Sequence, residues 1–253
     1  MDSLSKLLSI VTVSAFDLKR LVLTLESLLP QDRRIEHVLV IPREDKETLN
    51  FLRKFNAEND MRLKITFDDS NGIYPAMERG AKASSGKFFT FWNSGDYLAS
   101  RSQMNSLLDA LEHERARWVL TGGMFSWVNY PTPNMALHKK FLLQTPGSYI
   151  SHQCVLFSKE AFFNQHLFNF NYQVAADTEQ IFRLSKLSVP NYLPFSAVGV
   201  EEGNYSAVRH RRARLELFSI AMFNLTGIDR IKALGNLTRQ NLGFLFRKLS
   251  NRF

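Results

Sequence analysis

Short apolar segments alternate with amphipathic segments over the first 92 residues, and this alternation restricts the fold more than any other feature. Each apolar segment suits one buried strand, and each amphipathic segment has apolar residues at helical spacing. The expected strands lie at residues 7–13, 37–41, 62–67 and 87–92, and the expected helices at 17–29, 44–56 and 74–84. Because strands that alternate with helices pair in parallel, the sequence predicts an α/β fold with a doubly wound, mostly parallel, Rossmann-like sheet.

The rest of the chain has a different pattern. Residues 117–170 contain Gly122-Gly123 and several prolines, so we expect an irregular region that shapes a substrate site. A helix at 177–186, a strand near 193–200 and amphipathic helices from about residue 206 are expected to follow. These changes divide the chain into a first half at 1–100, a second half at 101–205 and a helical C-terminal extension at 206–253.

The positive charge is concentrated in the C-terminal extension. The whole chain has a net charge of +8, and residues 209–253 alone hold ten Lys or Arg and two acidic residues. Basic helices with interleaved apolar residues are typical of proteins that lie on an anionic membrane surface, and basic tails also occur in proteins that bind nucleic acid. A third interpretation is an ordinary helical layer over the sheet with solvated arginines.

Targeting and redox features favour the cytoplasm. The N-terminus lacks the basic start of a secretory signal, and no apolar run approaches the roughly 18 residues of a membrane-spanning helix. Cys154 is the single cysteine, which excludes an intramolecular disulfide and fits a reducing compartment. We therefore expect a soluble or peripheral cytoplasmic protein.

Three loops are candidates for a ligand site, because ligands of doubly wound sheets bind beyond the carboxyl ends of the strands. They are residues 14–16, 42–45 and 93–96. The third loop, Asn93-Ser94-Gly95-Asp96, offers an amide oxygen and a carboxylate, which are ligands that hard divalent cations prefer. The same four residues also favour a plain turn, and both interpretations stay open here.

Several motifs occur in an order that resembles family-2 glycosyltransferases of the GT-A fold, in particular short bacterial exopolysaccharide enzymes of the colanic-acid type. The resemblance covers about residues 7–205. The matching segments are Leu8–Val13, Asn71–Tyr74 with Ala76, Met77 and Gly80, Gly86-Lys87, Asn93–Asp96, Ser151–Gln153 and Ala175–Asp177.

The resemblance implies a nucleotide-sugar-binding half at residues 1–100. Asp96 would hold a divalent cation, Mg²⁺ or Mn²⁺, on the diphosphate of the nucleotide-sugar donor, and Asn93 would assist it. The residues that end the first strand, Thr12, Val13 and Ser14, would border the base and ribose of the donor.

The resemblance also implies an acceptor-binding half at residues 101–205. Asp177 would be the base that deprotonates the acceptor hydroxyl, and His152 would contact a donor phosphate or the acceptor. Both residues also have a purely structural interpretation. Asp177 and Gln180 fit a capping box at the start of a helix. His152 could be a partly buried histidine whose ring nitrogens are hydrogen-bonded within the protein.

The segment after the second strand departs from the family pattern. The family usually has Asp-Gly-Gly-Ser-x-Asp-Gly-Thr there, and its first Asp contacts the base. This chain has Pro42-Arg43-Glu44-Asp45-Lys46-Glu47-Thr48 instead. The base contact would then fall to Glu44 or Asp45, of which Asp45 is our candidate.

These features together predict an inverting glycosyltransferase that moves a sugar from a nucleotide-sugar to a lipid-linked or polysaccharide acceptor in surface polysaccharide biosynthesis. We expect it to be peripheral on the inner face of the cell membrane, bound through residues 209–253. The alternative is a catalytically degenerate relative that binds a sugar nucleotide or a partner protein. A nucleic-acid partner is not expected, because the sequence has no aromatic RNA-binding signature and no helix-turn-helix spacing.

Overall fold

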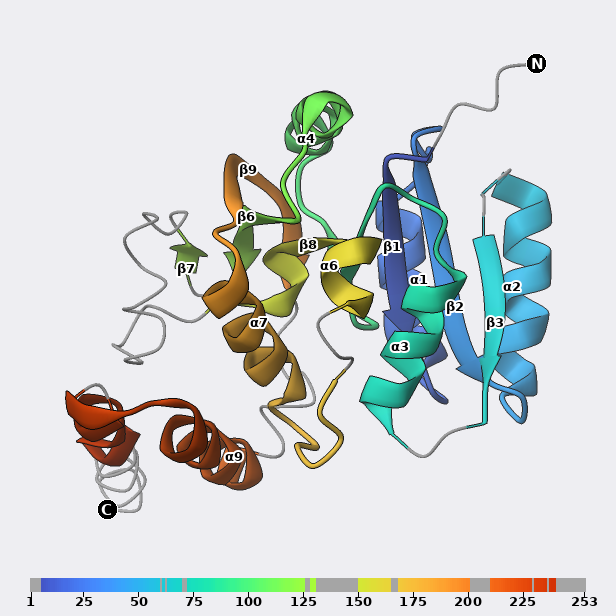
Figure 1. Cartoon of the computed structure of the whole chain (residues 1–253). Helices are drawn as coiled ribbons and strands as arrows, with labels where there is room; N and C mark the ends of the chain where they lie inside the picture. Colours follow the sequence, from blue (N-terminus) through green and yellow to red (C-terminus); the bar gives the residue numbers. More distant parts are fainter. Residues whose placement is uncertain are drawn as a thin grey trace, which may run out of the picture.

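A computed structural model describes residues 6–59, 61, 63–69, 72–125, 128–130, 150–164, 168–200, 210–228, 230–235 and 237–239. In this part of the chain a central sheet is covered by helices on both faces (Figure 1). No helix in these residues is long and apolar enough to cross a bilayer.

The first part of the chain forms the parallel part of the sheet. Its elements are β1 (Leu8–Val13), α1 (Leu18–Ser27), β2 (Ile35–Pro42), α2 (Lys46–Asn59), β3 (Leu63–Asp68), α3 (Ile73–Ala83) and β4 (Phe88–Phe91). β1 pairs in parallel with β2 and β4, and β2 pairs in parallel with β3. The predicted order of strands and helices in this region is confirmed.

The second part of the chain extends the same sheet. Its elements are β5 (Tyr97–Leu98), α4 (Arg101–His113), β6 (Trp118–Phe125), β7 (Val128–Tyr130), the 3₁₀ turn η2 (His152–Cys154), β8 (Val155–Ser158), α6 (Lys159–Phe163), α7 (Ala176–Leu187), β9 (Asn191–Val200) and α9 (His210–Asn224). β8 runs antiparallel to both β4 and β6, whereas β9 is parallel to β6. The sheet is therefore mixed.

The strand order is β3-β2-β1-β4-β8-β6-β9-β5, with β7 paired to β6 beside this path. The chain moves outward from β1 to β3 and then returns to place β4 on the other side of β1. The order thus reverses between β1 and β4, which is the position where ligands bind in doubly wound sheets.

The expectation that residues 117–170 are irregular is wrong for its described ends, because β6 and β8 are strands of the central sheet. Gly122 and Gly123 lie inside β6, where the register with β9 shifts. A Cβ on Gly122 would lie 2.4 Å from the Ser196 hydroxyl oxygen, so glycine permits the close approach of the two strands. The prolines that suggested irregular structure, at 131, 133 and 146, lie outside the described residues.

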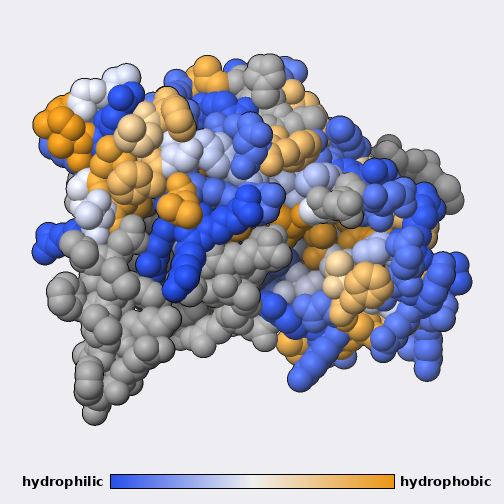
Figure 2. All heavy atoms as spheres, turned by 90° about the horizontal axis from the view of Figure 1, so that it is seen from below, coloured by the Kyte–Doolittle hydropathy of each residue, from blue (hydrophilic) through white to orange (hydrophobic). Residues whose placement is uncertain are grey.

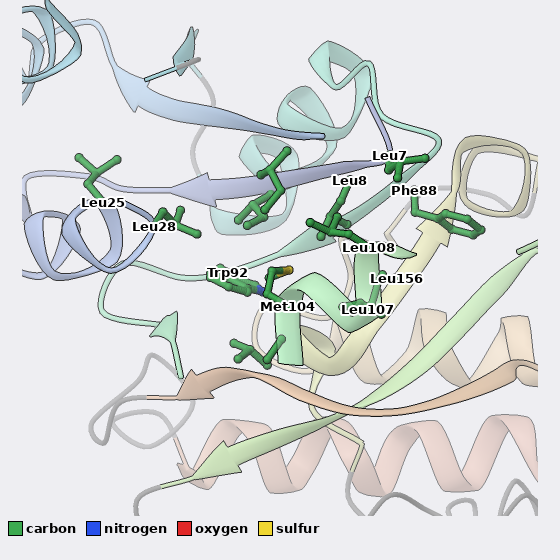
Figure 3. Packing of buried hydrophobic residues seen from close by; sticks show 14 of the residues in the cluster. Leu7, Leu8, Leu25, Leu28, Phe88, Trp92, Met104, Leu107, Leu108 and Leu156 are labelled. Atoms are coloured by element: carbon green, nitrogen blue, oxygen red, sulfur yellow. The ribbon is translucent and has the colours of Figure 1, made fainter. Parts of the chain in front are cut away.

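Alternate residues of the strands pack on opposite faces of the sheet. On β2, Leu39 and Ile41 join the cluster that contains α1, α2 and α4, whereas Val38 and Val40 join the cluster that contains α3, α6 and α7. Figure 3 shows part of the first cluster, in which Leu25 of α1 and Met104 of α4 approach the sheet from the same side. Both faces are apolar, as the continuous apolar runs in the sequence predict.

The C-terminal extension is helical in its described part. Beyond α9, residues 227–228, 230–235 and 237–239 also have helical backbone. Phe182 of α7 forms a small core with residues of this extension, namely Ala221, Leu225, Ala233 and Leu237. α9 therefore lies beside α7, at the lower left of Figure 1.

Candidate functional site

The loops after β1, β2 and β4 come together, as the sequence predicts. Ser94, after β4, donates its hydroxyl to the carbonyl oxygen of Val13 at 3.4 Å. Phe16, after β1, donates its N–H to Oδ2 of Asp45 at 2.8 Å. These hydrogen bonds join the three loops beside the reversal in strand order.

The loop after β4 is a tight turn closed by Asp96. The Asp96 N–H donates to the Asn93 carbonyl oxygen at 3.0 Å, and Asp96 Oδ2 accepts the Asn93 N–H at 2.6 Å. Gln153 donates its amide from Nε2 to the same oxygen at 3.0 Å. The turn interpretation is therefore confirmed, and only 1% of Asp96 is exposed.

Burial raises the pKa of Asp96 to about 6, against the lowering effect of the Gln153 and Asn93 hydrogen bonds and of the nearby His152. The hydrogen bonds from Asn93 and Gln153 both fall on Oδ2, so Oδ1 is the oxygen that suits a cation. No group of three or more His, Cys, Asp or Glu side chains with metal-site geometry occurs in the part of the chain that the structure describes. The residues fit a site in which one carboxylate and the phosphates of a ligand share the cation.

The three residues at the end of β1 have different environments. The Thr12 side chain is fully buried, and its hydroxyl lies 3.0 Å from Nε2 of His37 on β2. Burial lowers the pKa of His37 to about 3, so this ring is neutral. Thr12 therefore ties β1 to β2, and the expectation that its side chain borders a nucleotide is not supported. Val13 is half-buried, and the buried Ser14 hydroxyl has no hydrogen-bond partner in the described part of the chain.

Asp45 supports the loop structure with both of its oxygens. Oδ2 accepts the Phe16 N–H, and Oδ1 accepts the Thr48 N–H at 3.1 Å, which is the arrangement of a helix N-cap before α2. Asp45 thereby holds Phe16, whose φ of 55° is unusual for a residue other than glycine. Asp45 is buried and holds loop backbone with both oxygens, which is a structural role, and its expected contact with the base stays a prediction. Phe16 lies in the first of the predicted ligand loops, where the sequence analysis assigned it no individual role, and it is 69% exposed beside Asp45.

Asp177 is the centre of a second group of polar contacts. Its Oδ1 accepts the Tyr74 hydroxyl at 3.1 Å and the Thr178 N–H at 2.8 Å, and its Oδ2 lies 2.8 Å from Nδ1 of His152. The capping-box prediction is wrong, because α7 begins at Ala176 and its N-cap is Ala175. Asp177 is therefore not the N-cap of α7: it lies within the first turn, where it accepts the Thr178 N–H and faces partners on α3 and η2.

His152 connects the two groups. Its Nε2 lies 3.3 Å from the side-chain amide nitrogen of Asn93, and its Nδ1 faces Asp177. Burial acts to raise the pKa of Asp177, but the ion pair with His152 and the hydrogen bonds outweigh it and hold this pKa below the ordinary value. Burial likewise opposes protonation of His152, yet the same ion pair raises the pKa of its ring. His152 is thus a partner of Asp177, and its expected direct contact with a substrate is not supported by this geometry.

Two residues of this network had no role in the sequence analysis, although both belong to the motifs of the family resemblance. Tyr74 holds Asp177, and Gln153 holds Asp96.

Comparisons with known proteins show the family and the fold. The family model Glycosyl transferase family 2 matches residues 9–179, a range that includes most of β1, the loop after β4, His152 and Asp177. A comparison with curated proteins finds no match.

Solved structures share the fold at low sequence identity. The structure of Staphylococcus aureus TarS 1–349 in complex with UDP has a TM-score of 0.61 and 18% identity, and the match covers 94% of this chain and 72% of that chain. The mannosyltransferase PcManGT from Pyrobaculum calidifontis, in complex with GDP-Man and Mn²⁺, has a TM-score of 0.67 and 14% identity, with 91% and 68% covered. The family model spans more than half of the chain, and the sheet agrees with these structures, so the chain belongs to glycosyl transferase family 2 and is a glycosyltransferase of the GT-A fold.

Proposed function

We propose that this protein is an inverting glycosyltransferase that moves a sugar from a nucleotide-sugar to a lipid-linked or polysaccharide acceptor in surface polysaccharide biosynthesis. The observation that carries the proposal is the buried Asp177 carboxylate, which is linked through His152 to Asn93 in the loop after β4. A one-step displacement at an anomeric carbon requires a base for the acceptor and a loop that holds the donor, and the residues proposed for these two parts lie next to each other here.

In the proposed reaction, the acceptor oxygen attacks the anomeric carbon while the bond to the donor diphosphate breaks. The nucleoside diphosphate leaves with the electron pair of that bond, and the hydroxyl proton passes to the Asp177 carboxylate. The paired His152, together with hydrogen bonds from the Thr178 N–H and the Tyr74 hydroxyl, keeps this carboxylate ionised at neutral pH. Such a base is weak, but a correctly placed carboxylate is sufficient where the leaving group is stabilised.

Asp96, assisted by Asn93, is the proposed holder of a divalent cation. A bound cation would stabilise charge on the leaving diphosphate. The donor is proposed to be a nucleoside diphosphate sugar, because related folds carry UDP, UDP-GlcNAc or GDP-Man. Val13 and Ser14 remain candidates for its nucleoside, since the Ser14 hydroxyl has no hydrogen-bond partner among the residues that the structure describes.

The C-terminal extension is the proposed membrane contact, on the inner face of the cell membrane. Phe223 is 81% exposed and Leu215 is 72% exposed, and Ile228 and Ile231 are exposed as well. Arg211 and Lys232 lie in the same helical extension, and hydrophobic and hydrophilic groups lie next to each other on the left of Figure 2. Such surfaces bind anionic lipid through buried apolar area and charge attraction. Several basic residues of the tail, including Arg247 and Lys248, lie outside the described residues.

A second candidate is a degenerate relative that binds a sugar nucleotide or partner protein without turnover. The feature that favours it is the segment after β2, where the carboxylate of Asp45 accepts the backbone N–H groups of Phe16 and Thr48. The Asp177 network favours catalysis instead.

A panel of nucleotide-sugars, including UDP-GlcNAc and GDP-mannose, tests the proposal with and without Mn²⁺. We expect at least one donor to raise the melting temperature and to be hydrolysed or transferred, since a ligand of the folded state stabilises it. Stabilisation without any turnover, with or without an acceptor, would favour the degenerate relative.

A further inference from the structure

Helix α9 places a carboxylate against the backbone that leads into α7. Glu216 is buried, and its Oε1 accepts the Gln173 N–H at 2.9 Å. Its Oε2 accepts the N–H groups of Val174 at 2.8 Å and Ala175 at 2.9 Å. Arg212, one turn earlier on α9, donates from Nε to Oε1 at 2.9 Å. One side chain thus holds three successive backbone amides.

These amides lie directly before the helix that carries Asp177. Val174 and Ala175 are buried, so water does not easily replace Glu216 as their acceptor. Ala175 is the N-cap of α7 and has no side chain that could cap the helix. Glu216 therefore fixes, from α9, the backbone that leads into α7, up to and including the N–H of the N-cap residue. Asp177 is the second residue of this helix, and so it depends directly on the position of the first turn.

The later turns of α7 are held to α9 in a different way. Phe182 packs against Ala221 and Leu225, and the Lys186 ammonium group donates to the Asn224 carbonyl oxygen at 2.8 Å. Apolar contacts thus fix the middle and end of α7, and Glu216 fixes its start. The two contributions can be removed separately by mutation.

We infer that Glu216 is a positioning residue for glycosyl transfer, because it fixes the first turn of α7 and with it the Asp177 carboxylate. The inference rests on the proposed role of Asp177 as the base. The donor-side loops follow β1 and β4, on other elements, so Glu216 acts on turnover and not on donor affinity. The C-terminal extension is in this respect part of the catalytic structure.

The test compares Glu216→Gln and Glu216→Ala with Leu225→Ala, a control that weakens the α7–α9 packing and keeps the carboxylate. Hydrogen exchange is followed in peptides that cover residues 170–180, and kcat and KM are measured with the best donor of the nucleotide-sugar panel. Both Glu216 variants should speed exchange at 173–178. Glu216→Gln should lower kcat by roughly 10-fold or more, because displacement of a catalytic group by about 1 Å can cost about 100-fold. Donor KM should stay within about twofold of wild type.

Unchanged exchange at 173–178 in both Glu216 variants would overturn the inference. So would faster exchange with wild-type kcat, or a fall in kcat no larger than that of Leu225→Ala at equal folded fraction. The proposed function fails separately: wild-type turnover by Asp177→Asn would refute the base, whereas faster exchange in the Glu216 variants would still establish the contact with α7.

Discussion

Replacement of Gly80 by alanine tests how closely α3 must lie on the sheet to bring Tyr74 to Asp177. A Cβ at this position would lie 2.3 Å from Cγ1 of Val11 and 2.9 Å from Cγ2 of Val40, well inside the 3.4–4 Å of ordinary van der Waals contact. Both valines are fully buried, so neither can turn away freely. Gly80→Ala should therefore push α3 outward from β1 and β2.

The expected cost follows from this overlap. Overpacking a filled core costs about 1–3 kcal/mol, and the better helix propensity of alanine returns about 1 kcal/mol. Because the overlap with Val11 is severe, we take the upper end of that cost, and the net loss of about 2 kcal/mol should lower the melting temperature by about 4–8 °C in a chain of this size. Transfer activity at equal folded fraction should also fall, since α3 carries Tyr74.

Two controls make this prediction specific. Gly235→Ala, at a helical site where a Cβ meets nothing within 4 Å, should leave stability equal or slightly higher. Val11→Ala should cost less stability in the Gly80→Ala background than in wild type, because it removes the clashing methyl group. A Gly80→Ala protein as stable as wild type, or equal costs of Val11→Ala in both backgrounds, would refute the packing argument.

Three further predictions concern the network and the tail. Tyr74→Phe should move the acidic limb of kcat/KM to higher pH, because the charged form of Asp177 loses a hydrogen bond; an unmoved limb would contradict this. Asp96→Ala should abolish Mn²⁺-dependent donor binding, measured by calorimetry, and should also lower the melting temperature, because Asp96 closes the turn after β4. Arg211→Glu with Lys232→Glu should weaken binding to anionic liposomes, measured by co-sedimentation, by roughly 1 kcal/mol or more per substituted residue. Binding that changes neither with salt concentration nor with these substitutions would count against a membrane contact.

The parallel part of the sheet was predictable because its strands are buried on both faces. Continuous apolar runs separated by helical repeats identify such strands locally. β6 and β8 were not found, since their place in the sheet depends on antiparallel pairing between residues about 35 or more positions apart. The glycines of β6 suggest a loop in the sequence, although Gly122 in fact allows β6 and β9 to lie close together.

Site residues were found by motif, but their roles depend on partners distant in sequence. Asp177 has the sequence pattern of an N-cap, but it is the second residue of α7, and Glu216 of α9 holds the backbone before the helix. Asp45 matched an acid expected at a nucleotide, but its oxygens bind the Phe16 and Thr48 amides. Local propensity identifies a polar residue near a loop, and only the folded chain decides whether its oxygens face a ligand or the backbone.

The most direct test of the account is the turnover of Asp177→Asn with the donor identified in the nucleotide-sugar panel, alongside donor affinity by calorimetry. Asparagine can still accept the Tyr74 and Thr178 hydrogen bonds through its amide oxygen, so the fold and donor binding should persist. The loss of a general base should lower kcat by about 10²-fold or more. Wild-type kcat in a folded, donor-binding Asp177→Asn protein would contradict the assignment of Asp177 as the base.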